Sequence, residues 1–541
     1  MRWRVALVAV ALAGTAAACG PDTGLTALDA TPIAPPPTAA PPAPTVPPTA
    51  PVTTPPPSAP VLPTLPPNPP PQTTPPEPTG PTLPPILEPE LFTEVALADV
   101  VDVGAERRPR DYDALLAVAL VDIDNWLTDE LPDAFGTTWR PLEGGIWAGY
   151  PGRADDLPGC GEPITAYEDL MLYAAFYCEF GDFMAFDDGD EGIIVGLAEE
   201  LGPAVLGVVL AHEYGHAVQQ RTGALDEGRP TVLTEQQADC VSGAWLGRSY
   251  RGESPNLRLG DADLRAGLVA MVEVRDPVGV DQFELGGHGT AFDRVGAFQL
   301  GFTDGLASCA GLLDDPLPLM PNVFQSWLDL DRGGNAPYDC AEVPPAERAD
   351  CIPAPQFLAD DLNDYWQDRH PGFPTLQPLG VADFARFDCA DEVAITDVVS
   401  YCPGDNAIVY DEPYVIDLYR EFGDFTLGYF YGLAWAEVAQ LGDGSTLTGE
   451  PRALRNDCET GAWVRDITPD EFGRTRRNDD LDGDGEPDST VVTSPGDLDE
   501  AVRMAILLGD LGANIDEVGS PFEKIANFRA GVLGGPSACI P

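Results

Sequence analysis

The segment Pro203–Gln220 reads PAVLGVVLAHEYGHAVQQ, and both the fold and the chemistry expected of this 541-residue chain start from it. Proline suits the first turn of a helix, and Val205, Val208 and Val209 then recur at helical spacing. This pattern predicts a buried helix. Gly215 inside that helix costs about 1 kcal/mol relative to alanine, so we expect a close packing contact at this position.

Two histidines of this helix are spaced for metal binding. His212 and His216 are four residues apart, so their imidazoles project from one face, one turn above the other, as a single zinc ion requires. Glu213 follows the first histidine and would lie beside a metal-bound water rather than on the metal, which predicts a general base. The alternative is a pair of core histidines that only satisfy hydrogen bonds.

A catalytic zinc ion needs a third protein ligand and an open fourth position. A histidine at position 222 would complete the metzincin arrangement, but the residue is Thr222. The next helical segment, TEQQADCVSGAWLG, supplies Glu235 and, one turn later on the same face, Asp239. We predict Glu235 as the third zinc ligand and Asp239 as the acceptor for the free N–H of a ligand imidazole. The alternative for this pair is a solvated helix face.

Several separated motifs together resemble the neutral zinc metallopeptidases, a family of bacterial membrane-anchored proteins. The resemblance covers about residues 110–310. The motifs that carry it are AHEYGHAVQQ, TEQQADC, GGHGTAFDRVGAFQLGF and the predicted strand at Tyr177 and Cys178. The chain departs from the family at Ala217, where relatives often have another histidine.

The resemblance implies a zincin-type α/β peptidase domain. Carried over residue by residue, it makes His212, His216 and Glu235 the zinc ligands and Glu213 the base. His288, in GGHGT, is a further candidate, because its imidazole could donate a hydrogen bond to the oxyanion of peptide hydrolysis. The alternative for His288 is a loop histidine that caps a helix.

The chain also contains an internal repeat. Asp239–Trp245 reads DCVSGAW and Asp457–Trp463 reads DCETGAW, and further similar pairs precede and follow these blocks in the same order. We therefore predict a metallopeptidase domain at residues 96–330, a connector at 331–355 and a related domain at 356–541.

The second copy lacks the predicted zinc ligands. GLAWAEVAQL, from Gly432, aligns with the helix that carries the two histidines, and it contains no histidine. Leu454 is aligned with Glu235. Without imidazoles or that carboxylate nothing would hold zinc, so the second copy is predicted to be degenerate.

The cysteines follow the repeat. Eleven cysteines leave one unpaired in an oxidising compartment, whereas lipidation of Cys19 would leave ten for five bridges. Each copy has four cysteines in corresponding order, and two more fall in the connector. The predicted pairs are Cys160 with Cys178, Cys240 with Cys309, Cys340 with Cys351, Cys389 with Cys402, and Cys458 with Cys539.

The N-terminus has the features of an export signal. Residues 1–19, MRWRVALVAVALAGTAAAC, place Arg2 and Arg4 before an apolar run and then small residues. The end of this segment resembles the cleavage box of bacterial lipoproteins, which predicts lipidation at Cys19 and an extracytoplasmic location on the cell membrane. The alternative is ordinary cleavage after Ala18 and secretion.

Residues 20–95 are predicted to be a disordered linker rich in proline and threonine. Most of this stretch has almost no charge and cannot pack a core, so it favours extended polyproline II. After the signal no stretch approaches the ~20 apolar residues that a spanning helix needs. We expect the membrane to be a partner only through the lipid anchor.

The net negative charge of the chain limits the kinds of molecule that it is expected to bind. The chain has 29 basic and 88 acidic residues, and a formal charge of -59 repels nucleic acid and anionic lipid. Nucleic acid is therefore excluded, and a protein or peptide substrate is the expected partner. The sequence does not predict an oligomeric state.

One insertion in the second copy resembles a calcium loop. DLDGDGEPD places carboxylates at alternate positions with a glycine at the sharp turn, which suggests Ca²⁺ as a second cofactor. Val491 occupies the position where a bidentate glutamate closes an EF-hand, so a flexible acidic loop is the alternative. The predicted calcium ligands are Asp480, Asp482, Asp484 and Asp488.

Taken together, the sequence predicts an α+β chain with a duplicated zincin-like metallopeptidase domain. The expected function is zinc-dependent hydrolysis of peptide bonds in the cell envelope, as an endopeptidase. The alternative is a cell-envelope binding or scaffold lipoprotein with a structural or vestigial zinc site. Glu213 favours hydrolysis, because a purely structural zinc site has no need of a base.

Overall fold

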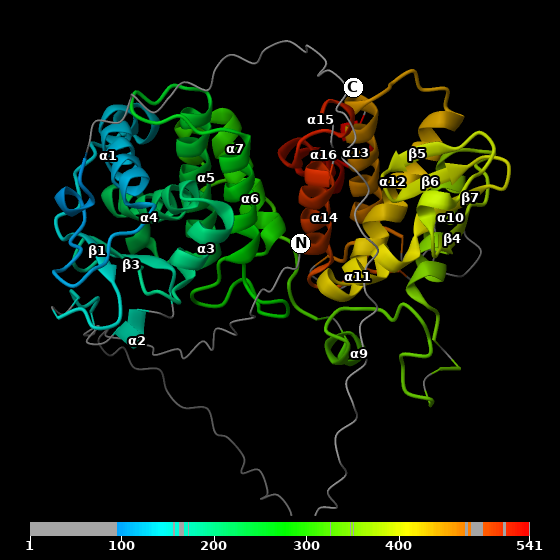
Figure 1. Ribbon diagram of the computed structural model, residues 1–541, viewed down its shortest axis with the longest axis horizontal. Helices are drawn as coiled ribbons and strands as arrows, with labels where there is room; N and C mark the ends of the chain where they lie inside the picture. The colour runs from blue at the N-terminus through cyan, green and yellow to red at the C-terminus, as the bar shows by residue number, and fades with distance from the viewer. Residues whose placement is uncertain are drawn as a thin grey trace, which may run out of the picture. The chain divides into compact units, whose positions relative to one another are not determined.

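Three helices form the centre of the first half of the protein, residues 96–330. In the computed structural model α4 (Ala204–Thr222) packs against α5 (Thr231–Tyr250), which packs against α7 (Ala291–Asp304) (Figure 1). The predicted helix is confirmed, with Pro203 as its N-cap residue and Gly223 in the left-handed conformation at its end. Fifteen of its 19 residues are buried, so it is a core helix rather than a surface helix.

The structure describes most of the chain after residue 94. Of the predictions, the export signal, Cys19, residues 20–94 of the linker and all four calcium ligands (Asp480, Asp482, Asp484 and Asp488) lie outside the described residues. These comprise 95–154, 157–161, 167–170, 173–324, 326–346, 348–349, 351–470, 474–477, 491–511 and 515–539.

A small mixed sheet accompanies the three helices. Its strands are β1 (Gly145–Gly149), β2 (Ala175–Cys178) and β3 (Phe183–Asp187), in the order β1-β3-β2. β1 runs parallel to β3, and β2 runs antiparallel to it. β2 is the strand predicted at Tyr177 and Cys178, and it contacts α4.

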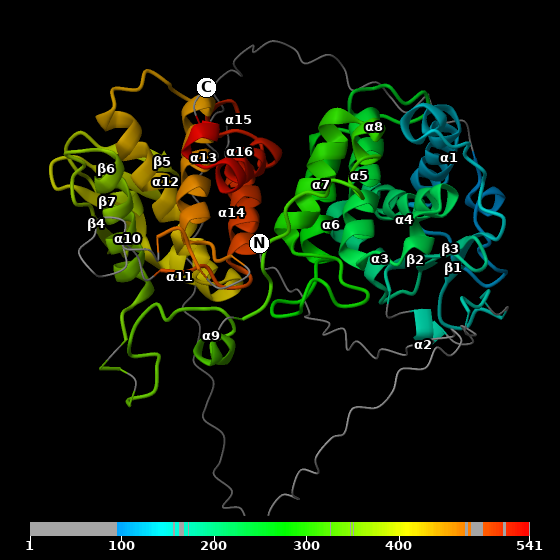
Figure 2. The same cartoon turned by 180° about the vertical axis from the view of Figure 1, so that it is seen from behind.

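The second half, residues 356–541, also contains three central helices and a sheet, which has one strand more than the sheet of the first half (Figure 2). α12 (Phe425–Gly442) packs against α13 (Glu450–Ile467), which packs against α16 (Pro521–Gly534). The sheet order is β4-β7-β6-β5, in which β4 is parallel to β7, and β6 is antiparallel to β7. The four strands are β4 (Gln377–Val381), β5 (Val393–Thr396), β6 (Val399–Cys402) and β7 (Ala407–Asp411).

The remaining elements connect and cover these two groups. α10 begins at Ala354, within the predicted connector. The helices are α1 (Asp113–Phe135), α2 (Tyr167–Leu170), α3 (Ile193–Leu201), α6 (Asp261–Glu273), α8 (Leu306–Cys309), α9 (Trp327–Asp331), α10 (Ala354–Arg369), α11 (Glu412–Phe422), α14 (Asp497–Leu511) and α15 (Ile515–Val518), and the 3-10 turns are η1 (Leu97–Asp99), η2 (Ala224–Glu227), η3 (Phe384–Arg386) and η4 (Pro536–Cys539).

Glycine allows the central helices to approach closely. A Cβ added at Gly215 would lie 2.6 Å from the Cα of Ala238, so the contact predicted at this position is confirmed. A Cβ added at Gly301 would lie 1.8 Å from the carbonyl oxygen of Cys240, and one at Gly531 would lie 1.9 Å from that of Cys458. The same backbone approach thus joins α5 to α7 and α13 to α16.

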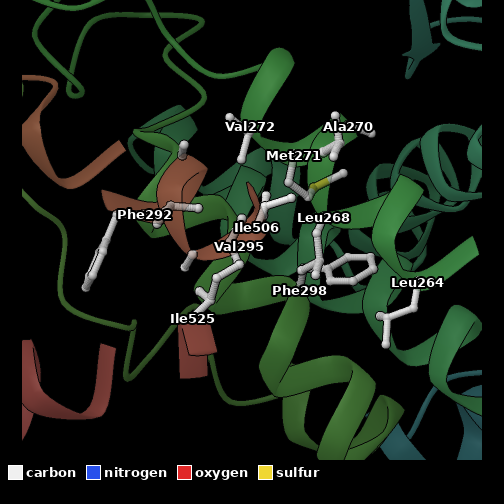
Figure 3. Close-up of a cluster of buried hydrophobic side chains, with 14 of the residues drawn as sticks. Leu264, Leu268, Ala270, Met271, Val272, Phe292, Val295, Phe298, Ile506 and Ile525 are labelled. Carbon is white, nitrogen blue, oxygen red and sulfur yellow. The ribbon is translucent and has the colours of Figure 1, made fainter. Parts of the chain in front are cut away.

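Each half has a buried hydrogen bond between a tryptophan and an aspartate. The two halves also pack against each other. Trp245 donates its indole N–H to Asp122 at 3.0 Å, and Trp463 donates to Asp361 at 2.7 Å. Side chains of α6 and α7 from the first half lie in one buried cluster with side chains of α14 and α16 from the second (Figure 3). Residues Pro89–Pro541 accordingly belong to a single compact unit.

The five predicted disulfide pairs are confirmed. Cys240–Cys309 joins α5 to α8, and Cys458–Cys539 joins α13 to η4, so the long bridge has the same place in both halves. The other bridges are Cys160–Cys178, Cys340–Cys351 and Cys389–Cys402. Among the described helices, none combines the length and the apolar composition needed to cross a membrane.

Candidate metal centre

The three predicted zinc ligands meet between α4 and α5. Nε2 of His212 lies 3.0 Å from Oε2 of Glu235, and Nε2 of His216 lies 3.3 Å from Oε1 of the same carboxylate. One ligating atom from each residue lies within 4.8 Å of the other two, as the donors of one metal ion must. The structure therefore brings the two imidazoles of α4 together with a carboxylate of α5, which follows His216 by 19 residues in the chain.

The other ring nitrogen of each histidine is held in place. Nδ1 of His212 lies 2.7 Å from Oδ1 of Asp239, the acceptor that the sequence predicted. Nδ1 of His216 lies 3.0 Å from Oε1 of Gln219, whose amide donates in turn to the carbonyl oxygen of Thr234 at 2.6 Å. With each Nδ1–H donated in this way, the neutral form of each imidazole would direct the lone pair of Nε2 towards Glu235.

Arg294 completes the support of His212. This residue comes from α7, and its guanidinium donates to both oxygens of Asp239, at 2.9 and 2.7 Å. It also donates to the carbonyl oxygen of Val274 at 2.6 Å. Because Arg294 and Asp239 are both buried, this bidentate pair holds the carboxylate in one orientation.

The electrostatics of the cluster reflect its buried carboxylates. Burial lowers the pKa of His212, but the charges of Asp239 and Glu235 outweigh burial and raise that pKa to about 10. Burial raises the pKa of Glu235, but His216, His288 and His212 together hold it well below its usual value. Glu235 is therefore ionised, which is the state in which a carboxylate binds a metal ion.

One oxygen of Glu235 shows that the residues fit a metal ion. Oε2 is buried and lies 3.0 Å from Nε2 of His212, yet this contact lacks hydrogen-bond geometry, so the atom has no hydrogen-bond donor among the described residues. A buried carboxylate oxygen without a donor is costly. A divalent cation between this oxygen and the two imidazole nitrogens removes that cost, and two nitrogens with one oxygen suit zinc.

Glu213 lies beside these ligands on α4. It is 7% exposed, and its charge raises the pKa of the neighbouring His216. His216 itself is only partly buried, with 16% of its side chain exposed, so the cluster is within reach of solvent.

His288 lies on the loop before α7, within electrostatic reach of Glu235. Its main-chain N–H donates to both oxygens of Asp276, and its Nδ1 lies 3.5 Å from Oδ1 of that residue. Its side chain is 47% exposed, and its charge lowers the pKa of Glu235. His288 is thus half exposed, within electrostatic reach of Glu235, and held by Asp276.

Sequence reasoning missed three residues of this site, namely Arg294, Gln219 and Asp276. Gln219 had a local signal, since it follows His216 by three residues and so lies on the same helix face. Arg294 lies within the motif GGHGTAFDRVGAFQLGF, but its partner Asp239 is 55 residues away.

The corresponding place in the second half has different chemistry. Counting from the shared Asp–Cys pair puts Ala453, and not Leu454, at the position of Glu235, so that alignment was wrong by one residue. Gln219 and Gln440 donate to equivalent carbonyl oxygens, those of Thr234 and Arg452, which aligns α4 with α12. This alignment places Leu433 at His212, Ala434 at Glu213 and Glu437 at His216.

The chain is similar to proteins of Mycobacterium tuberculosis and Mycobacterium bovis that are described as uncharacterized. They are 29% identical to it over 195 residues, which cover 31% of this chain. The chain spans 63% of the length of these relatives. No family model and no solved structure matches the chain. The functional argument therefore rests on the site.

Proposed function

We propose that the first half of this protein is a zinc-dependent peptidase. The observation that carries the proposal is the convergence of His212, His216 and Glu235, with both Nδ1 atoms engaged and one buried Glu235 oxygen left without a donor. Three protein ligands leave a coordination position for water or substrate, as in catalytic zinc sites. Glu213 beside them supplies the base that hydrolysis needs.

In the proposed mechanism each residue has one role. His212, His216 and Glu235 hold the ion, which when bound lowers the pKa of a water molecule and polarises the substrate carbonyl. Asp239, held by Arg294, keeps the proton of His212 on Nδ1, so that Nε2 stays free. Glu213 takes a proton from the attacking water and passes it to the leaving amine. His288, which reaches solvent beside the site, donates to the oxyanion.

The setting of this activity is proposed from the sequence. We propose an extracytoplasmic endopeptidase that is tethered through Cys19 and belongs with the neutral zinc metallopeptidases. The second half is proposed to be a degenerate copy. The order of three of its four strands, β4-β7-β6, and the contacts of its central helices correspond to those of the first half, whereas the positions aligned with the ligands hold Leu433, Ala453 and Glu437.

Metal analysis combined with digestion of a peptide library tests this function. Wild-type protein should contain one zinc ion per chain and cleave peptides. The Glu213→Gln variant should keep the zinc ion and lose activity by about 10²-fold or more, which is the usual contribution of a general base. Glu199→Gln, an exposed glutamate on α3, is the matched control and should keep full activity.

The same experiment separates hydrolysis from a binding role. If Glu213→Gln keeps both zinc and wild-type cleavage, the base assignment is wrong. If wild-type protein contains zinc but cleaves no peptide in the library, the site is structural, as in a scaffold lipoprotein.

A further inference from the structure

A second group of metal-binding side chains lies outside the candidate zinc site. Asp424 is the N-cap residue of α12, and Asp497 and Glu500 are in the first turn of α14. One carboxylate oxygen from each residue lies within 4.8 Å of the other two. The three residues are between 6% and 8% exposed, so this is a buried cluster and not an acidic surface.

One oxygen of each carboxylate accepts a main-chain N–H. Oδ2 of Asp424 accepts from Ala336 at 2.9 Å, and Oδ2 of Asp497 accepts from Ser494 at 2.8 Å. Oε2 of Glu500 accepts from Phe425, the first residue of α12, at 2.7 Å. These bonds hold the carboxylates in place from three different segments of the chain.

The other oxygens of the two aspartates have no such partner. Oδ1 of Asp424 and Oδ1 of Asp497 are buried and lack a hydrogen-bond donor among the described residues. Of the nearby arginines, Arg503 pairs with Glu273 at 3.1 Å and Arg275 pairs with Asp499 at 2.9 Å. Two unpartnered oxygens in a buried group of like charges point to a missing cation.

We propose that Asp424, Asp497 and Glu500 bind a calcium ion. A donor set of carboxylate oxygens without nitrogen or sulfur suits a hard cation, and calcium accepts irregular geometry and several carboxylates. Asp329 of α9 is a fourth carboxylate within electrostatic reach, since its charge raises the pKa of Asp424 and of Asp497. This ion would join the connector, α12 and α14, and so stabilise the second half.

The proposed site is distinct from the calcium loop that the sequence suggested. It is also independent of the proposed peptidase activity, because none of its residues contacts the candidate zinc ligands.

Calcium titration of the full-length protein, after treatment with a chelator, tests the proposal. The informative variant is Asp497→Asn/Glu500→Gln, because both amides keep an oxygen for the main-chain N–H groups while the charge is removed. Asp482→Asn/Asp484→Asn, with the same type of substitution in the loop, is the matched control. Calorimetry measures binding, and thermal unfolding measures its effect on Tm.

Wild-type and loop-variant protein should bind calcium at this site, and 1 mM calcium should raise their Tm by about 2 °C or more. The cluster variant should bind calcium about 100-fold or more weakly, because affinity follows the charge of the ligands. Without calcium its Tm should be higher than that of the wild type, since repulsion between buried carboxylates is removed.

Three outcomes would overturn the proposal. Wild-type protein without heat of binding or Tm response would show that the carboxylates share protons instead of a metal ion. Calcium binding that is lost in the loop variant and kept in the cluster variant would assign it to the loop. A response to magnesium or manganese without one to calcium would refute calcium as the ion.

Terbium luminescence provides a second measurement in case the cluster variant does not fold. Tyr419 lies near the cluster, where burial and the charges of Asp424 and Glu500 raise its pKa. Terbium in place of calcium should therefore be excited through this ring. Tyr419→Phe should reduce the emission and leave calcium affinity within about twofold; unchanged emission would place the ion elsewhere.

Discussion

The two pairs of central helices, α4–α5 and α12–α13, differ more in chemistry than in architecture. Both have the close glycine contact to the third helix, the buried Trp–Asp hydrogen bond and the long disulfide. None of these contacts involves a candidate metal ligand. The interactions that stabilise this scaffold are therefore separate from the residues that form the candidate metal centre.

The buried aspartate that holds His212 has a counterpart in the second half, where the histidine is absent. In the first half Arg294 holds Asp239, which holds His212. In the second half Lys524 donates to both oxygens of Asp457, at 3.1 and 2.9 Å. The carboxylate accepts there from the hydroxyl of Tyr429. Both halves have a cation and an aspartate at this place. The aspartate of the second half accepts from the phenol of Tyr429, since the position aligned with His212 is Leu433.

The position aligned with His216 holds a carboxylate in the second half, and its charge is neutralised by an arginine. Glu437, at the position of His216, pairs with Arg452 at 2.6 Å and accepts from Asn456 at 2.8 Å. This place therefore holds an ion pair in the second half, whereas in the first half one Glu235 oxygen has no hydrogen-bond donor among the described residues. The unpartnered carboxylate oxygens of the second half, among the described residues, are instead those of Asp424 and Asp497, at the start of α12 and of α14.

Exchange of a ligand for its second-half counterpart should have the largest effect. His212→Leu places in the first half the residue found at position 433. We expect zinc binding and peptide cleavage to be lost together, because two donors are too few for a catalytic zinc site. Zinc content by mass spectrometry under native conditions and peptide cleavage check this. Retention of one zinc ion per chain would remove His212 from the ligand set.

Loss of the Arg294 side chain should have the next largest effect. Arg294→Ala leaves Asp239 buried without its cation, which costs about 3–5 kcal/mol in the free energy of unfolding. Arg294→Lys introduces the cation that the second half uses at this place and should cost less than half as much. Denaturant unfolding measures both.

Zinc affinity provides an independent measure of Arg294. Removal of a residue that supports a metal ligand typically weakens affinity 10- to 100-fold. Competition with a chromogenic chelator should show this loss in Arg294→Ala. Equal stability and affinity of the alanine and lysine variants would mean that the positive charge has no role.

Matched glycine substitutions should have smaller and similar effects in the two halves. An added methyl group in Gly301→Ala or in Gly531→Ala meets a carbonyl oxygen of the adjacent helix, at the same kind of contact. Each should reduce the free energy of unfolding by roughly 1–3 kcal/mol, as overpacking does. A large loss in one half and none in the other would show that the two helix contacts are not equivalent.

The smallest expected effect is a pH dependence of stability that comes from the carboxylate cluster of the second half. Burial raises the pKa of Asp424 to about 7, and burial and neighbouring carboxylates raise those of Asp497 and Glu500 well above their usual values. The folded state therefore binds more protons than the unfolded state between about pH 4 and 7, and stability falls as pH rises through this range.

In chelator the Tm of the wild type should decrease between pH 5 and pH 8, relative to that of Asp497→Asn/Glu500→Gln. The charges that face the cluster, those of Asp329, Asp499 and Arg503, are present in both proteins, so the difference isolates the two carboxyl groups. Identical pH profiles would show that the three carboxylates do not interact.

Much of the site could be predicted from the sequence, because its main signals are local. The helical period alone places His212 and His216 on one face, and it places Glu235 and Asp239 on one face of the next helix. Cysteine order within the repeat was sufficient to predict the five bridges. The strand at Tyr177 and Cys178 and the packing contact at Gly215 were likewise predictable from short segments.

Tertiary structure decided which faces meet. Helical periodicity places side chains around one helix axis, but the distance from Glu235 to the two imidazoles depends on how α4 packs against α5. Arg294 is 55 positions from Asp239, and Asp424 is 73 positions from Asp497 and 76 from Glu500. No local pattern encodes such proximity. Backbone hydrogen bonds within a helix determine which side chains share one of its faces. Side-chain packing between helices determines which of these faces meet.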